Sequence, residues 1–102
     1  MKTKTSKLRK LEESRYSIVY DNLDICCMCE LKPRSDLNEV FCGRNRQNSM
    51  KYGCVMPLCR DCHTRYTNDR NIQLHYMKLF QEKFEETHSR QEFIDIFKRN
   101  YL

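Results

Sequence analysis

Two pairs of cysteines with the same internal spacing constrain this chain more than any other feature of its sequence. Cys26 and Cys29 form the first Cys-x-x-Cys pair, and Cys59 and Cys62 form the second. Each pair places two sulfur atoms on one tight turn, so two such turns can offer four thiolates to Zn²⁺ in its preferred tetrahedral geometry. The sequence therefore predicts a structural zinc site with these four cysteines as the metal ligands.

The size of the chain favours a metal site, because 102 residues of which 39% are hydrophobic can bury only a small core. No apolar signal peptide follows Met1, and seven cysteines are an odd number. We therefore expect a reducing, cytoplasmic compartment, in which Cys-x-x-Cys pairs bind zinc rather than form disulfides. Cys27, Cys42 and Cys54 lie outside the pairs and are expected to be small buried hydrophobic residues.

The two pairs are separated by 29 residues, enough to form structure of their own. Apolar runs predict three short strands, at residues 17–20, 37–41 and 54–58, with a polar loop between the last two. Residues 63–68 contain neither Pro nor Gly and predict a helix. The order strand, strand, helix predicts a ββα unit within residues 16–70, with zinc at its base.

Residues 71–102 predict two helices that pack on this core. Asn71 is the expected cap of the first helix, whose apolar residues recur at helical spacing. These residues are Ile72, Tyr76, Leu79, Phe80 and Phe84. Ser89 and Glu92 form a capping-box signature at the start of the second helix. The fold class predicted for the whole chain is therefore α+β.

Most of the net charge of +5 lies in residues 1–15, which hold six basic and two acidic residues. We interpret this segment as a basic N-terminal arm that can bind phosphate groups, although a solvated terminus explains it equally well. Residues 30–70 carry a further net charge of +3. No apolar run approaches the ~18 residues of a membrane span, so no membrane partner is expected.

Taken together, the motifs resemble those of a known family. The loop Gly-x-Asn-Arg-x-x-Ser-x-x-Tyr-Gly runs from Gly43 to Gly53, and Pro-Leu-Cys-x-x-Cys-His runs from Pro57 to His63. With the first cysteine pair and the two final helices, this pattern is similar to small HNH endonucleases common in phage genomes. The resemblance extends from about Leu8 to Leu102. It implies a zinc-stapled ββα-metal (HNH, His-Me finger) core with two C-terminal helices.

The resemblance also implies a site for phosphodiester hydrolysis. In such relatives a strand histidine is the general base, and two helix histidines bind a divalent ion such as Mg²⁺, Mn²⁺ or Ni²⁺. Here Asn38 stands at the position of the base and Thr67 at that of the second metal ligand, so His63 alone remains. An amide accepts no proton at neutral pH, and Glu39 should point to the opposite face of the strand. The candidate catalytic residues are therefore Asn38, Glu39, His63 and Thr67, and efficient cleavage is not expected.

Five residues are candidate contacts to nucleic acid, chiefly DNA: Arg44, Asn45, Arg46, Lys51 and Arg65. A solvated basic surface explains the cations about as well, and a turn preference or a hydrogen bond within the loop explains Asn45. Three functions stay open: an HNH endonuclease with a weakened site, a catalytically silent relative that binds nucleic acid, and a protein-interaction module or inhibitor of a host enzyme. We expect nucleic-acid binding in a bacterial or phage-infected cell, with cleavage left open.

Overall fold

The computed structural model describes residues 6–102, so Lys2 and Lys4 of the expected basic arm lie outside the described residues. The elements are α1 (Ser6–Glu13), β1 (Asp36–Glu39), the 3₁₀ helix η1 (Gly43–Asn45), α2 (Arg46–Lys51), β2 (Val55–Leu58), α3 (Arg60–Asn68), α4 (Arg70–Phe84) and α5 (Arg90–Phe97). Five α-helices and one two-stranded antiparallel sheet in this part of the chain confirm the α+β class. In residues 6–102 no helix is both long and apolar enough to cross a membrane.

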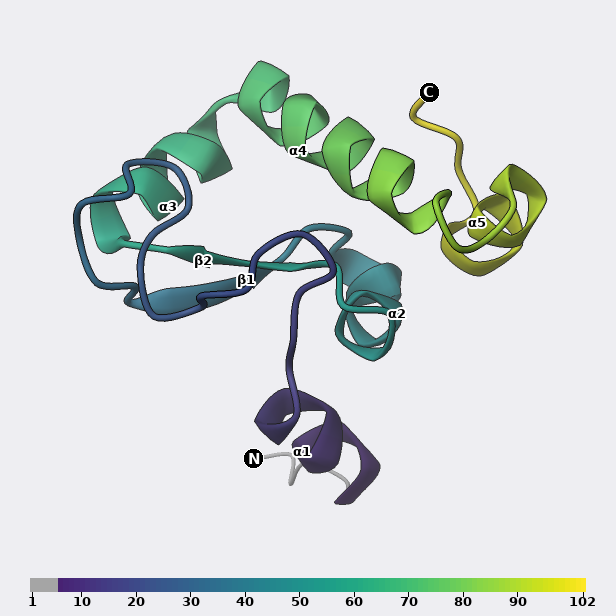
Figure 1. The fold of residues 1–102 in the computed structure, drawn as a ribbon, viewed down its shortest axis with the longest axis horizontal. Helices are drawn as coiled ribbons and strands as arrows, with labels where there is room; N and C mark the ends of the chain where they lie inside the picture. The colour runs from purple at the N-terminus through teal and green to yellow at the C-terminus, as the bar shows by residue number, and fades with distance from the viewer. Residues whose placement is uncertain (1–5) are drawn as a thin grey trace.

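The sheet lies at the centre of the molecule, with α3 at one end, α4 across one side and α1 on the other (Figure 1). Asp36 of β1 is opposite Leu58 of β2, and Glu39 is opposite Val55. Every residue of β2 is buried. Because α3 follows β2 directly, the chain has the expected order of strand, strand and helix. The domain boundaries at residues 15 and 70 stay predictions.

The predicted strand at residues 17–20 is wrong. The Ser17 hydroxyl oxygen accepts hydrogen bonds from the backbone N–H groups of Val19 and Tyr20, at 3.2 and 3.1 Å. Such a side-chain bond closes a local turn and competes with strand pairing. One backbone hydrogen bond of 2.9 Å still joins this segment to the Gly53 carbonyl.

The segment between the strands is not the simple loop that its polarity predicts, because it contains η1 and α2. The six residues of α2 include neither Gly nor Pro and several good helix formers. The side-chain amides of Asn45 and Asn48 donate to the carbonyls of Phe97 and Ile96, at 2.9 and 3.2 Å. These carbonyls lie at the end of α5 and lack partners within that helix. The two asparagines thus join the segment between the strands to the last helix.

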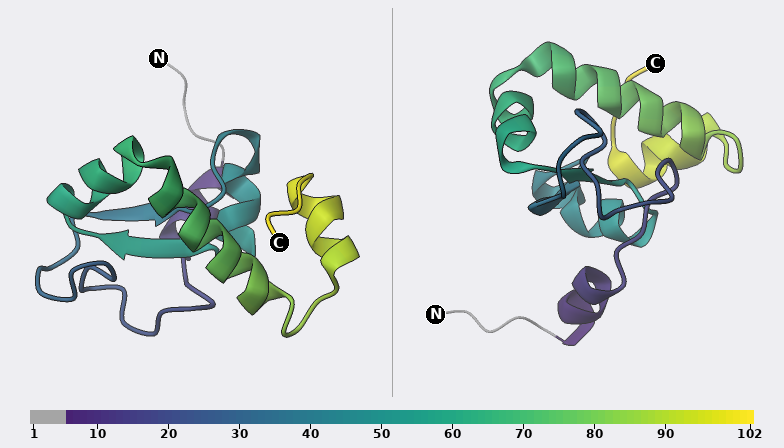
Figure 2. Two further views of the ribbon diagram at one scale, coloured as in Figure 1. Left: turned by 90° about the horizontal axis from the view of Figure 1, so that it is seen from above. Right: turned by 60° about the vertical axis from the view of Figure 1, so that its left-hand side comes forward.

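The core is formed where aromatic residues of α4 and α5 meet Phe41, which follows β1. The Phe41 ring centroid lies 4.7 Å from that of Phe97 and 5.3 Å from that of Phe93. Phe80 and Phe84 of α4 are also buried. Figure 2 shows α4 running alongside the sheet and leading into α5. The last two helices therefore supply much of the apolar burial that holds the short sheet in place.

The caps of the last two helices differ in how well they were predicted. Asn71 is not the cap of α4, because Asp69 accepts hydrogen bonds from the N–H groups of Asn71 and Ile72, at 2.9 and 3.2 Å. Asp and Asn are almost equally favoured as caps, so composition does not distinguish these two positions. The capping box of Ser89 and Glu92 at the start of α5 is confirmed, with both of its hydrogen bonds present.

Ser89→Ala should lower the free energy of unfolding by about 1 kcal/mol, because the Glu92 N–H loses its acceptor. Urea unfolding followed by circular dichroism measures the change. Ser89→Thr keeps the hydroxyl and is the matched control, with a smaller loss expected. An equal loss for both variants would show that the cap hydrogen bond does not stabilise α5.

Candidate metal centre and adjoining cleft

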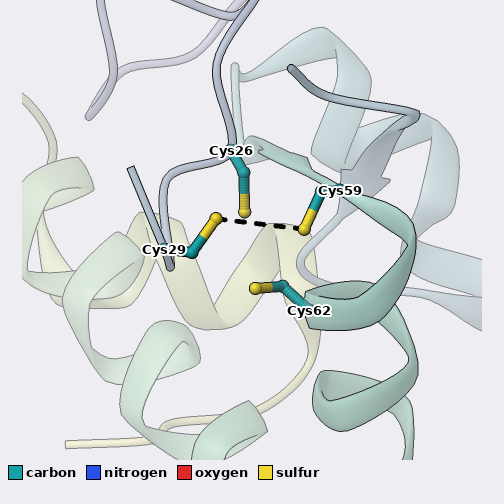
Figure 3. A group of neighbouring side chains, drawn as sticks. All are labelled: Cys26, Cys29, Cys59 and Cys62. Carbon is teal, nitrogen blue, oxygen red and sulfur yellow. Dashed lines mark hydrogen bonds between the residues drawn. The ribbon is translucent and has the colours of Figure 1, made fainter. Parts of the chain in front are cut away.

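Four cysteine side chains from two distant parts of the chain point toward one another (Figure 3). Cys26 and Cys29 belong to the long segment before β1, Cys59 follows β2, and Cys62 lies in the first turn of α3. Their four sulfur atoms all lie within 4.8 Å of one another. The cluster therefore closes the ββα unit at the end of the sheet where α3 begins.

The spacing of the sulfur atoms fits a bound metal ion. Tetrahedral zinc with Zn–S bonds of ~2.3 Å places its ligand sulfurs roughly 3.8 Å apart. The Sγ atoms of Cys29 and Cys59 are 3.9 Å apart, and all four cysteines are free thiols. Cys26, Cys59 and Cys62 are buried and Cys29 is half-buried, so the cluster is largely shielded from water. The cluster is compatible with a structural metal ion such as zinc.

The electrostatics of the cluster also favour a cation. Burial raises the pKa of the Cys26 thiol, but surrounding backbone N–H groups outweigh it and lower that pKa to about 6. The N–H groups of Leu31 and Lys32 lower the pKa of Cys29. Burial and hydrogen bonds to neighbouring cysteines raise the pKa of Cys62 to about 12. The site thus favours the thiolates of Cys26 and Cys29, and a positive ion at its centre would favour the thiolate of Cys62 as well.

The three cysteines outside the cluster have different surroundings. Cys54 is fully buried, as expected, and burial raises its pKa to about 12. Cys27 is half-buried. The expectation for Cys42 is wrong, because this residue is exposed in the turn that follows β1. A cysteine side chain is small enough to be tolerated both in the core and on the surface, so residue type alone does not decide its burial.

His63, in the first half of α3, is held by a carboxylate that the sequence analysis missed. Its Nδ1 atom lies 2.9 Å from the Asp36 carboxylate, and the Arg60 guanidinium lies 3.6 Å from the same oxygen. The hydrogen bond to His63, the Ser35 hydroxyl and the charge of Arg60 together lower the pKa of Asp36. Asp36 stands two residues before Asn38, and therefore on the same face of the strand. The alternation of side chains along a strand could therefore have pointed to Asp36 as a residue of this site.

Asn38, His63 and Thr67 are brought to one surface, which we call the α3 cleft. Asn38 and Thr67 line a cavity of about 160 Å³, and Thr67 and His63 line a neighbouring cavity of about 210 Å³. The Thr67 hydroxyl donates to the His63 carbonyl at 2.8 Å. Within residues 6–102, the buried side-chain nitrogen of Asn38 has no hydrogen-bond partner. Burial raises the pKa of the neighbouring Tyr66, and the Asn38 amide offsets part of that rise.

Glu39 borders the α3 cleft, but its carboxylate is held by arginines. One carboxylate oxygen lies 3.1 Å from the Arg15 guanidinium and 3.6 Å from that of Arg46. The Glu39 side chain is only 13% exposed. A carboxylate oxygen that is held by two guanidinium groups is not free to approach a water molecule in the cleft. Glu39 is therefore poorly placed to act as the general base that the sequence analysis considered.

The candidate nucleic-acid contacts divide into exposed cations and residues whose side chains are engaged within the fold. Arg44, Lys51 and Arg65 are exposed, on η1, α2 and α3. Arg46 forms an ion pair of 3.2 Å with Glu12 in addition to its contact with Glu39, and the Asn45 amide is bonded to α5. The Asn45 amide is thus used in a hydrogen bond within the protein. The side chains of Arg44, Lys51 and Arg65 are exposed and can contact a ligand.

Comparison with known proteins does not identify a family. No family model matches the chain, and neither a curated protein nor a solved structure matches it. The function must therefore be inferred from the residues and their geometry.

Proposed function

We propose that this protein is an HNH-like nucleic-acid-binding protein with a weakened phosphodiesterase site. We further propose that the structural metal ion is zinc. One observation carries the proposal. The four-cysteine cluster lies at the base of a strand, strand and helix unit, and Asn38, His63 and Thr67 line adjoining cavities of that unit. These are the positions that the resemblance assigns to the base and to the two metal ligands.

The side chains at these positions support weak cleavage or none. Asn38 cannot take a proton from water, and Glu39 is paired with two arginines. Asp36 engages Nδ1 of His63, which leaves Nε2 for a divalent ion. Metal-bound histidines commonly pair with a carboxylate in this way. A bound ion would polarise the scissile phosphate, but one imidazole holds it less firmly than two.

The charge of the protein supports nucleic acid as the ligand. The chain carries a formal net charge of +5, and Arg60 joins Arg44, Lys51 and Arg65 among the exposed cations on the elements around the sheet. Cations on such a surface neutralise phosphates and release counterions, which drives binding. An inhibitor that mimics DNA should instead be acidic.

Fluorescence anisotropy with a labelled DNA duplex, single-stranded DNA and RNA of the same sequence tests the proposal. We expect the logarithm of the binding constant to fall linearly as the logarithm of salt concentration rises. Arg44→Gln with Arg65→Gln should reduce the slope by about 2, because each variant removes one phosphate contact. Lys78→Gln with Lys98→Gln makes the same charge change elsewhere and should change the slope little. Binding that does not respond to salt would contradict the proposal.

The alternative function is a protein-interaction module or inhibitor of a host enzyme. An exposed apolar residue favours it, since Leu31 is 86% exposed just after the first cysteine pair. A single exposed leucine is common on protein surfaces, and the alternative therefore ranks second. Loss of all nucleic-acid binding in the anisotropy experiment would favour this function over the first.

A further inference from the structure

A groove between α1 and α2, which lie side by side in Figure 1, is lined by basic and amide side chains. We call it the lysine groove and define it by Lys7, Lys10, Leu11, Ser14, Gln47, Asn48 and Lys51. Its volume is about 330 Å³. Residues of α1 at helical spacing form one wall, and α2 forms the other. The groove is separate from the α3 cleft, with which it shares no lining residue.

The lysine groove carries positive charge without a matching negative charge. Three lysines line it, and no carboxylate does. Among residues 6–102, no salt bridge involves Lys7, Lys10 or Lys51. The Lys51 ammonium instead lies over the Tyr52 ring, 5.4 Å from its centroid. Cations gathered in one groove repel one another, and a bound anion removes that cost.

Two carboxylates close to α1, those of Glu12 and Glu39, are engaged by arginines. Glu12 lies 3.2 Å from Arg46, and Arg15 lies 3.1 Å from Glu39. The Tyr16 hydroxyl also donates to the Lys51 carbonyl, at 3.0 Å. The Glu12–Arg46 ion pair joins α1 to α2, the Tyr16 hydrogen bond holds the segment after α1 on α2, and neither Glu12 nor Glu39 lines the groove. The groove is therefore held in place by the fold and is not an accidental gap between two exposed helices.

We propose that the lysine groove binds the phosphodiester backbone of the nucleic acid, as an anchoring site outside the α3 cleft; this inference rests on the proposed function. Ammonium groups and the Gln47 amide are hydrogen-bond donors of the kind that contact phosphate oxygens. Leu11 is the one apolar residue in the lining, which disfavours a lipid acyl chain. Arg46 of α2, the helix that forms one wall of the groove, is paired with Glu39, which lines the α3 cleft.

The test compares two triple variants in the anisotropy assay. Lys7→Gln, Lys10→Gln and Lys51→Gln together should weaken DNA binding about 10- to 100-fold at 0.15 M salt and reduce the salt slope by about 3. The matched control replaces Lys78, Lys83 and Lys98 with Gln, which removes the same charge from α4 and the end of α5. We expect the control to bind nearly as well as the unaltered protein. Circular dichroism and metal content verify that both variants are folded.

A second measurement detects the contact directly. Lysine acetylation of the unaltered protein, followed by mass spectrometry, should show that DNA protects Lys7, Lys10 and Lys51 more than Lys78. If the unaltered protein binds DNA but the groove variant binds equally well and its lysines are not protected, the groove proposal is overturned and the proposed function stands. If the unaltered protein binds no nucleic acid, or binds only vesicles of anionic lipid, both are overturned.

Discussion

Chelation of the structural metal ion should unfold this protein. Binding of zinc to structural sites has an apparent free energy of about 10–16 kcal/mol, whereas small domains are stable by about 5–15 kcal/mol. The cluster joins the segment before β1 to the start of α3, and the sheet between them has only two strands of four residues each. Circular dichroism during titration with a strong chelator should therefore show loss of helix. Restoring zinc should restore it.

Two cysteine variants separate the metal cluster from a general effect of losing a thiol. Cys59→Ser should remove most bound metal and prevent cooperative unfolding, because three remaining thiolates hold the ion less firmly. Cys42→Ser is the matched control, since Cys42 is exposed and outside the cluster. Acidification should act as chelation does, because protons compete with the metal for the thiolates. Metal analysis that finds no ion in the purified protein, or equal stability of both variants, would contradict the prediction.

Two histidines placed in the α3 cleft should increase DNA cleavage strongly. Asn38→His places an imidazole base on β1, and Thr67→His adds an imidazole four residues after His63, on the same face of α3. A positioned general base contributes about 10²- to 10⁴-fold to the rate, so the double variant should nick plasmid DNA faster by about this factor. The assay contains Mg²⁺, Mn²⁺ or Ni²⁺ in turn.

The controls identify the source of any cleavage. His63→Ala in the double variant should abolish the gain, because one of the two metal-binding imidazoles is lost. Asn38→Gln with Thr67→Ser keeps polar side chains without imidazoles and should stay as inactive as the unaltered chain. Strong cutting by the unaltered protein that Glu39→Ala abolishes would mean that Glu39 is the base. It would also contradict the view that its pairing with Arg15 and Arg46 keeps it from that role.

Local sequence signals predicted the elements whose causes are local. The capping box at Ser89 depends on residues three positions apart, and the buried phenylalanines of α4 depend on helical spacing. The failed predictions concern segments in which two local structures compete. Residues 17–20 have the composition of a strand, but the Ser17 side chain closes a turn there, and α2 forms where polarity favoured a loop.

The sites show the same division. Cysteine spacing was enough to predict the four-cysteine cluster, because each pair is a local motif and zinc chemistry requires two pairs. The pairing of His63 with Asp36 and the arginines around Glu39 could not be predicted from spacing, because the partners come from separate elements. The lysine groove is a further case, since it exists only where α1 meets α2.

The sequence by itself therefore determined which four cysteines can bind a metal ion and where the histidines stand along the chain. These properties follow from residue type and from spacing within single motifs. Only the tertiary structure decided which carboxylates are already engaged by arginine or histidine and which lysines of residues 6–102 lack a counterion. The physical reason is that ion pairing and burial depend on distances between side chains that the fold brings together from separate parts of the chain.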